Sequence, residues 1–315
     1  MSRTLLKAHL ALFGVALIYS GNYIIAKEVM SSNVLRPLAF IVIRVVCGAS
    51  LFWIFDRVFI REKVEAKDYK LLILSGLFGI ALNQMFFFSG LNLTTPINAS
   101  LIMTTTPILV LVASSILLNE KVTGRKLLGI GVGALGAIII IAYGRTISFN
   151  SDGFVGDLLI FANASSFGIF LVISKPLMYK YHPITVTKWI FTFAIVFVMP
   201  FGYKQFVTTD WSAFSTLAWL GVAYVVIGTT FLAYLLNTYA LSLVPPTIVS
   251  IYIYLQPFLT TTLSLALGLE TINVFKILAG SLIFLGVYLV SVPKNKRKSV
   301  FSVNHLEDQP VNKEG

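Results

Sequence analysis

Charge is scarce in this sequence. Only 12% of its 315 residues are charged, whereas 57% are hydrophobic and the mean hydropathy is +0.86. An average soluble protein carries about twice that charged fraction. Cys47 is the only cysteine, which excludes an internal disulfide. No segment matches GxxxxGK[ST], so the chain has no P-loop with which to use ATP as an energy source.

Clusters of chemically active side chains are also missing. His9, His182 and His305 lie far apart, and no Cys/His or acidic cluster offers a metal site or a nucleophile. We therefore predict no enzyme activity, no catalytic residue, no metal and no cofactor. None of the 13 acidic residues lies in the middle of an apolar stretch, so a buried carboxylate that relays protons has little support beyond Glu28. Facilitated diffusion and proton-coupled exchange both stay open.

Long apolar stretches fill the chain instead. Ten of them are about twenty residues long or longer, enough to cross a hydrocarbon core of roughly 30 Å as a helix. They cover residues 8–30, 37–59, 70–91, 97–118, 124–143, 156–178, 184–203, 214–239, 247–268 and 272–292. The connections between them are too short for a soluble domain. The sequence predicts an all-α integral membrane protein with ten transmembrane helices.

Residues 90–140 and 240–290 align without a gap at a constant offset of 150. Leu91, Pro96, Ser100, Pro107 and Glu120 are among the residues that recur, in the same order, in the second stretch. The chain therefore contains two copies of one membrane unit. Since five spans are an odd number, the second copy enters the membrane from the opposite side, and such inverted repeats allow two mirror-related states.

The net charge of +11 follows membrane topology and does not indicate a nucleic-acid partner. If both termini are cytoplasmic, most of the 24 basic residues lie on the cytoplasmic side, which is the positive-inside pattern. The exceptions are Lys27, Arg36, Arg44, Arg145, Lys204 and Lys276. We predict a multi-pass protein of a cell (inner, cytoplasmic) membrane, with the lipid bilayer as its surroundings.

These features give four predicted regions. Residues 1–145 form the first five-helix repeat, 146–155 an extracytoplasmic connection, and 156–292 the second repeat. Residues 293–315 form a disordered cytoplasmic tail whose Lys/Arg cluster lies near anionic headgroups.

Residues 72–141 and 239–290 resemble the drug/metabolite transporter superfamily, and in particular its ten-helix EamA-type members. The shared pattern is a helix that starts at proline, a second proline eleven residues later, then Glu and a helix punctuated by glycine. It occurs at Pro96, Pro107 and Glu120 and again at Pro246, Pro257 and Glu270. The resemblance implies a central cavity, cytoplasmic termini, a small-molecule substrate and export of that substrate. It names no substrate and no universal set of site residues.

Pro107 and Pro257 lie in the middle of the fourth and ninth stretches and should bend those helices. Each proline frees the carbonyl four residues back, at Met103 and Ile253. One interpretation is a pair of kinked helices that line a cavity. The other is a packing kink whose carbonyls are satisfied by neighbouring threonines.

Neutral polar and aromatic side chains recur inside the apolar stretches, where facing lipid is costly. Helical spacing places several on shared faces. We predict a substrate-binding role for Tyr19, Asn22, Asn83, Gln84, Tyr234, Asn237, Tyr252 and Gln256. Tyr23 shares the face of Tyr19 and Asn22, and Asn163 ranks lower because small polar residues often serve close packing. The alternative for each residue is an interhelical hydrogen bond that only holds the bundle together.

Three charged residues are candidates for substrate attraction or coupling. Arg44 lies about 12 Å deep in the second stretch, by the helical rise, while Lys27 and Glu28 end the first stretch. Arg44 or Lys27 could attract an anionic group such as a carboxylate. The favoured alternative is that Arg44 snorkels outward or pairs with Glu28.

The glycines of the fifth and tenth stretches should let helices approach closely, within each half or in a homodimer.

The sequence as a whole predicts a secondary transporter for small metabolites, such as amino acids or related solutes, that works by alternating access. A membrane receptor or scaffold without transport is the alternative.

Overall fold

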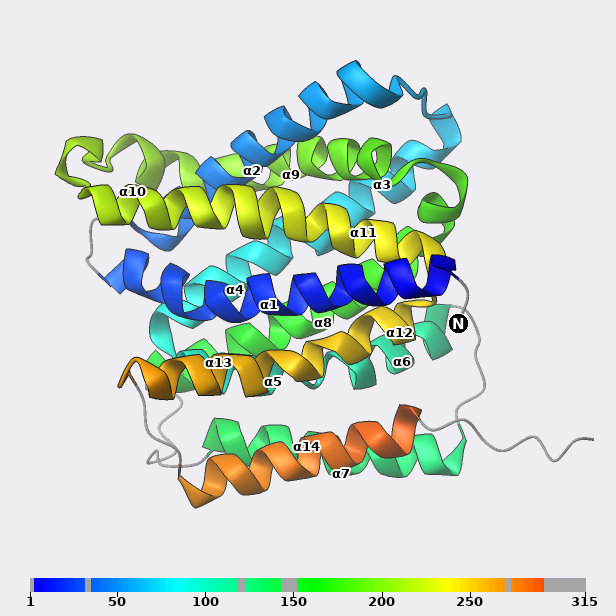
Figure 1. Cartoon of the computed structure of the whole chain (residues 1–315), viewed down its shortest axis with the longest axis vertical. Helices are drawn as coiled ribbons and strands as arrows, with labels where there is room; N and C mark the ends of the chain where they lie inside the picture. The colour runs from blue at the N-terminus through cyan, green and yellow to red at the C-terminus, as the bar shows by residue number, and fades with distance from the viewer. Residues whose placement is uncertain (1–2, 32–34, 118–122, 143–151, 270–272, 292–315) are drawn as a thin grey trace, which may run out of the picture.

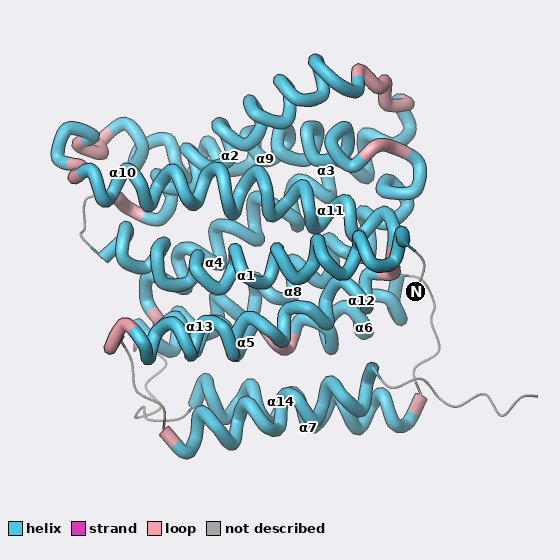
Figure 2. The backbone as a smooth tube through the Cα atoms, in the orientation of Figure 1, coloured by secondary structure: helices cyan, strands magenta, loops and turns pink. Residues whose placement is uncertain are grey.

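The computed structural model describes residues 3–31, 35–117, 123–142, 152–269 and 273–291. Every regular element in these ranges is helical (Figures 1 and 2). Eight helical segments there are long and apolar enough to cross a membrane, by length and composition. Two further helices, α7 (Gly124–Ala142) and α14 (Val274–Ser291), complete the ten predicted segments. The predicted all-α membrane fold is confirmed. The predicted tail and most of the predicted connection between the repeats lie outside the described residues.

We number the ten segments as spans in chain order. Spans 1 to 5 are α1 (Arg3–Ser31); α2 (Pro37–Phe55) with η1 (Asp56–Ile60); η2 (Ala66–Asp68), α3 (Tyr69–Gly76), η3 (Leu77–Ala81) and α4 (Leu82–Leu93); α5 (Pro96–Met103) and α6 (Thr106–Leu117); and α7. Spans 6 to 10 are α8 (Asp152–Lys180); α9 (Pro183–Val207); α10 (Thr216–Ala223), η5 (Tyr224–Leu232) and α11 (Ala233–Leu243); α12 (Pro246–Ile251), η6 (Tyr252–Tyr254) and α13 (Leu255–Ala266); and α14. The short turn η4 (Trp211–Ala213) lies between spans 7 and 8.

Local sequence sets where these helices begin. Proline is the first residue of α2, α5, α9 and α12, a position whose N–H would have no helical partner. Thr95 caps α5, because its hydroxyl accepts from the backbone N–H of Asn98 at 3.3 Å. Ser215 caps α10 in the same way at Ala218. Spans can therefore follow one another after very short turns.

Helices of the two halves pack against each other in matching pairs. α1 packs on α11, and its counterpart α8 packs on α4, which is the counterpart of α11. α2 packs on α9 and α7 packs on α14, so these helices pair with their own counterparts (Figure 1). A twofold axis that exchanges the halves produces this network, and inverted five-span repeats require that axis to lie in the membrane plane.

Departures from regular helix also recur in both halves. Span 3 contains the π-helical stretch η3 and span 8 contains the π-helical stretch η5, at positions related by the offset of 150 in the sequence. A π-helical turn is wider than an α-helical turn and often occurs at functional sites. Span 4 is interrupted between Met103 and Thr106, and span 9 changes to a tighter turn over Tyr252–Tyr254. The irregular turns of spans 3 and 4 therefore recur in spans 8 and 9, whereas the π-helical η1 at the end of span 2 has no counterpart in span 7.

Glycines hold α7 and α14 together across the two halves. A Cβ on Gly286 would lie 2.5 Å from the backbone N of Gly133 and 2.6 Å from the carbonyl oxygen of Gly129. A Cβ on Gly136 would lie 2.7 Å from the carbonyl oxygen of Ala279. Gly133 packs within its own half, because a Cβ there would also meet Ile108 of span 4. Gly136 and Gly286, in contrast, join the last helix of one half to the last helix of the other.

We predict that Gly286→Ala destabilises the protein by about 1–3 kcal/mol, since the added methyl group meets backbone atoms that cannot rotate away. The matched control is Gly131→Ala in α7, where an added Cβ meets nothing within 4 Å. Thermal unfolding in detergent should show a lower Tm for Gly286→Ala alone. Equal Tm values for the two variants would contradict the close approach of α7 and α14.

Candidate functional site

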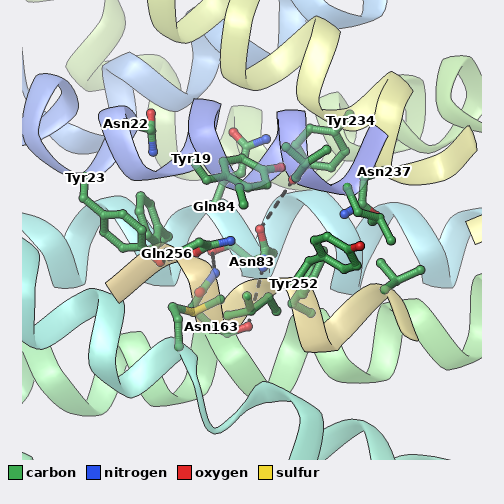
Figure 3. Close-up of a pocket in the computed structure, with 18 of the residues that line it drawn as sticks. Tyr19, Asn22, Tyr23, Asn83, Gln84, Asn163, Tyr234, Asn237, Tyr252 and Gln256 are labelled. Carbon is green, nitrogen blue, oxygen red and sulfur yellow. Dashed lines mark hydrogen bonds between the residues drawn. The ribbon is translucent and has the colours of Figure 1, made fainter. Parts of the chain in front are cut away.

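A cavity lies between the two halves, and we call it the central cavity. Its volume is about 70 Å³, which leaves room for a few waters. Side chains from spans 1, 2, 3, 4, 6, 8 and 9 line it (Figure 3). They are Leu12, Val15, Ala16, Tyr19, Asn22, Tyr23, Arg44, Asn83, Gln84, Phe87, Phe88, Met103, Asn163, Phe167, Tyr234, Asn237, Val249, Tyr252, Ile253 and Gln256.

The structure brings all eight neutral polar candidates to this one cavity, although they lie on spans 1, 3, 8 and 9. They are Tyr19, Asn22, Asn83, Gln84, Tyr234, Asn237, Tyr252 and Gln256. Figure 3 shows their side chains converging from helices of both halves. Helical spacing explains this placement for Tyr19 with Asn22, Tyr234 with Asn237, and Tyr252 with Gln256, which are three or four residues apart. Asn83 and Gln84 are adjacent in span 3, and both reach the cavity.

Hydrogen bonds across the cavity join the halves. The Tyr23 hydroxyl donates to the Gln256 side-chain oxygen at 3.0 Å, linking spans 1 and 9 (Figure 3). The Asn163 amide donates to the backbone oxygen of Asn83 at 2.7 Å, linking spans 6 and 3. The Tyr234 hydroxyl donates to the backbone oxygen of Gly79 at 3.1 Å. These bonds account for some of the polar groups as contacts that hold the bundle together.

Other polar atoms of the cavity wall are buried without a hydrogen-bond partner. They include both side-chain polar atoms of Gln84 and the side-chain oxygens of Asn22, Asn163 and Asn237. Leaving such a group unpaired costs roughly 1–3 kcal/mol, so unpaired groups are rare in proteins unless water or a ligand satisfies them. Several of them around one cavity form a wall that can bind a polar solute.

Arg44 projects into the same cavity and is only 3% exposed. Its Nε donates to Thr230 Oγ1 at 2.7 Å and its Nη2 donates to Thr229 Oγ1 at 3.2 Å. The guanidinium also lies 4.4 Å from the centre of the Phe88 ring. The favoured expectation, that Arg44 snorkels outward or pairs with Glu28, is wrong: span 8 holds this side chain at the cavity.

Lys27 and Glu28 are not among the cavity residues. The Lys27 ammonium donates to the carbonyl oxygens of Leu91 and Asn92 at 2.9 and 2.7 Å, at the end of span 3, and Glu28 is exposed. Cations are favourable at a helix C-terminus, where carbonyls lack helical partners. Lys175 makes the equivalent contact in the second half, with the carbonyls of Leu241 and Val244.

Both prolines lie beside breaks that border the cavity. α6 begins next to Pro107, and the Thr106 hydroxyl donates to the freed carbonyl of Met103 at 2.7 Å. Pro257 follows the tight turn η6, whose residues Tyr252 and Ile253 line the cavity. In the first half both interpretations of the proline kink therefore hold. The break in span 4 borders the cavity, and Thr106 satisfies the freed carbonyl of Met103.

Sequence reasoning undervalued two polar residues. Tyr23 and Asn163 both line the cavity and both hydrogen-bond across it. The signal for Tyr23 was its position on the face of Tyr19 and Asn22. The apolar walls, such as Phe87 and Phe167, gave no signal because phenylalanine is common throughout this chain.

Two stretches of the chain, residues 6–142 and 154–292, each match the model of the EamA-like transporter family. The chain belongs to this family of membrane transporters. The predicted family resemblance is thereby confirmed, and the two matches correspond to the two halves of the EamA-like transporter described above.

Relatives of this EamA-like transporter span distant organisms. An uncharacterized transporter of Archaeoglobus fulgidus is 26% identical over 294 residues, which cover 92% of this chain and 99% of the relative. The uncharacterized transporter YyaM of Bacillus subtilis is 26% identical over 74% of this chain and 77% of its own length. A WAT1-related protein of Arabidopsis thaliana is 25% identical over 92% of this chain and 86% of its own length. A crystal structure of another protein shares the fold, with a TM-score of 0.64, 19% identity, and coverage of 90% of this chain and 96% of that one.

We predict that water-soluble thiol reagents reach the central cavity as this transporter opens. In a background that carries Cys47→Ser, Asn237→Cys should react with a methanethiosulfonate reagent about tenfold faster than Thr238→Cys, because a thiol must be accessible to react. Asn237 lines the cavity, whereas the neighbouring Thr238 is fully buried against span 7 and bonds Thr187. Mass spectrometry of the labelled protein measures both rates. Slow labelling at both positions would contradict an accessible cavity.

Proposed function

We propose that this protein is a secondary transporter that moves small polar or amphipathic metabolites, such as amino acids and related solutes, through the central cavity. The observation that carries the proposal is the set of unpaired polar atoms on Gln84, Asn22, Asn163 and Asn237, contributed by both halves to one cavity. A receptor or scaffold has no need to keep hydrogen-bonding groups unsatisfied at the centre of a membrane bundle.

Alternating access follows from the repeated architecture in this proposal. The cavity of about 70 Å³ is smaller than a metabolite, so in this proposal the two halves must move apart before a solute can enter. The pair α1 with α11 and the pair α8 with α4 occupy equivalent places in the two halves. Loosening one pair opens the cavity to one side of the membrane, and loosening the other opens it to the opposite side.

We further propose that both termini are cytoplasmic, that the protein resides in a cell (cytoplasmic) membrane and that transport runs outward. The distribution of Lys and Arg supports this orientation, and the direction rests on the family resemblance alone. The proposed units are residues 1–145 and 156–292, joined by an extracytoplasmic connection at 146–155, with a cytoplasmic tail at 293–315. The cavity holds a small-molecule substrate, and no enzymatic step is needed for this role.

Counterflow in proteoliposomes tests the transport function. Purified protein is reconstituted into vesicles loaded with an unlabelled amino acid or related metabolite, and entry of the same labelled solute is followed across a panel of such solutes. At least one solute should enter faster than it enters protein-free vesicles. If no solute does so, the chain is better described as a receptor or scaffold.

Gln84→Leu should separate binding from stability in this assay. Both polar atoms of the Gln84 side chain lack a partner, so leucine removes an unsatisfied amide. We expect the Tm of the empty protein to rise, while transport falls about tenfold because a hydrogen bond to the solute is lost. The matched control is Gln205→Leu at the far end of span 7, where the side-chain oxygen of Gln205 accepts from the backbone N–H of Leu38 outside the cavity, and both values should change little. A fall in both Tm and transport for Gln84→Leu would instead assign Gln84 a structural role.

The proposed orientation makes a separate prediction for single cysteines in the Cys47→Ser background. A membrane-impermeant maleimide applied to intact cells should label Thr208→Cys, in the connection between spans 7 and 8, because that connection is extracellular. It should label Ala66→Cys, at the start of span 3, only after the cells are permeabilised. Both positions are exposed, so access to the reagent differs only by membrane side. The opposite pattern would invert the orientation.

A further inference from the structure

The charge of Arg44 is held in place without being neutralised. Two of the five N–H groups of its guanidinium donate to Thr229 and Thr230. The other three have no hydrogen-bond partner among the described residues, and the side chain borders the central cavity. A guanidinium presents its donors as a planar fork that matches a carboxylate. Arg44 therefore keeps donors available at the cavity.

The two threonines act as acceptors for Arg44 because their own protons are used elsewhere. Both hydroxyls donate to the backbone oxygen of Val225, at 2.7 Å from Thr229 and 2.9 Å from Thr230. The wide turn of η5 lets two successive side chains reach one carbonyl. Hydroxyl oxygens fix the orientation of the guanidinium, but they carry no negative charge.

Other buried cations of the described chain are compensated. Lys188, 3% exposed, pairs with Asp56 at 2.6 Å, and Lys175, 8% exposed, bonds the carbonyls that end span 8. No Asp or Glu is among the described residues that line the cavity. A lone charge inside a membrane is costly and in most proteins marks a functional site. Arg44 thus differs from both buried lysines.

We propose that Arg44 is the anion-binding group of the central cavity and that the transported solutes carry a carboxylate beside a compact apolar body. This proposal rests on the proposed transport function and names the substrate class of the same site. The carboxylate accepts the free donors of Arg44 as a charge-assisted, bidentate pair. The apolar body packs against Phe87, Phe88 and Phe167, and the unpaired oxygens of Asn22 and Asn237 accept hydrogen bonds from an ammonium or hydroxyl group of the solute.

The sign of the charge in the cavity can be measured without knowing the natural solute. Asn237→Cys in the Cys47→Ser background is labelled with an anionic and with a cationic methanethiosulfonate reagent, and the ratio of the two rates is compared with that of a free thiol. The positive cavity should favour the anionic reagent about tenfold over the free-thiol ratio. Adding Arg44→Gln should return the ratio to that of the free thiol.

Arg36→Gln is the matched control, since Arg36 is an exposed arginine that precedes the same helix, α2. It should leave the ratio unchanged. Equal ratios with and without Arg44→Gln would overturn the proposal. Size-exclusion chromatography confirms that each variant is folded.

Protection of Asn237→Cys from the neutral reagent N-ethylmaleimide tests the carboxylate itself. Phenylpropanoate should slow labelling, and phenylpropanamide should need a concentration at least about tenfold higher for the same protection. Arg44→Gln should abolish this difference between the two compounds. Equal effects of the acid and the amide, or no protection by the acid, would overturn the assignment of a carboxylate. These assays do not depend on transport. Counterflow without charge selectivity would keep the transport function and overturn the role of Arg44. Charge selectivity without counterflow would keep Arg44 as an anion-binding group and overturn the transport function, and with it the substrate class.

Discussion

Inside a bilayer there is no bulk water to satisfy a polar group, and this constraint governs the structure. Backbone N–H and C=O groups are satisfied by hydrogen bonds within the helices. Where a helix is broken, side chains supply the missing bond, as where the Thr106 hydroxyl donates to the carbonyl of Met103. Buried cations meet the constraint with a carboxylate, as in Lys188 with Asp56, or with the carbonyls of a helix end. Several unpaired amide atoms and the free donors of Arg44 gather around the central cavity, whereas the other unpaired groups, such as the hydroxyls of Ser75 and Thr260, lie apart from it. That contrast is the physical reason to locate function there.

Duplication explains how a chain of modest length encloses such a space. The two copies contribute equivalent pairs of helices, so the cavity lies on the axis that relates them. The wall is nevertheless asymmetric, because Arg44 of span 2 lines the cavity and span 7 contributes no lining residue. Symmetry therefore provides the path to both sides of the membrane, and departures from symmetry provide the chemistry that would select a solute.

Periodicity and composition predicted the helical segments and the eight neutral polar residues of the cavity, because helical faces follow directly from spacing. They failed where a residue's role depends on a distant partner. Arg44 was expected to snorkel outward or to pair with Glu28, but its partners Thr229 and Thr230 lie in span 8. Lys27 was a candidate for substrate attraction, but it caps the end of span 3. The contact of Gly286 with Gly133 between the halves was likewise invisible to local patterns, since it depends on which helices become neighbours.

The paired lysines Lys27 and Lys175 limit how well the positive-inside rule can orient this chain. Lys27 and Lys175 close equivalent helix ends, and the inverted arrangement of the copies puts them toward opposite membrane surfaces. Whichever surface faces the cytoplasm, one of the two lysines therefore lies on the non-cytoplasmic side, where Lys and Arg are usually scarce. That lysine is retained against the bias because it bonds the carbonyls that end a neighbouring span, which is a local electrostatic need. Counting charges to orient an inverted duplicate will accordingly misplace at least one residue of every such pair.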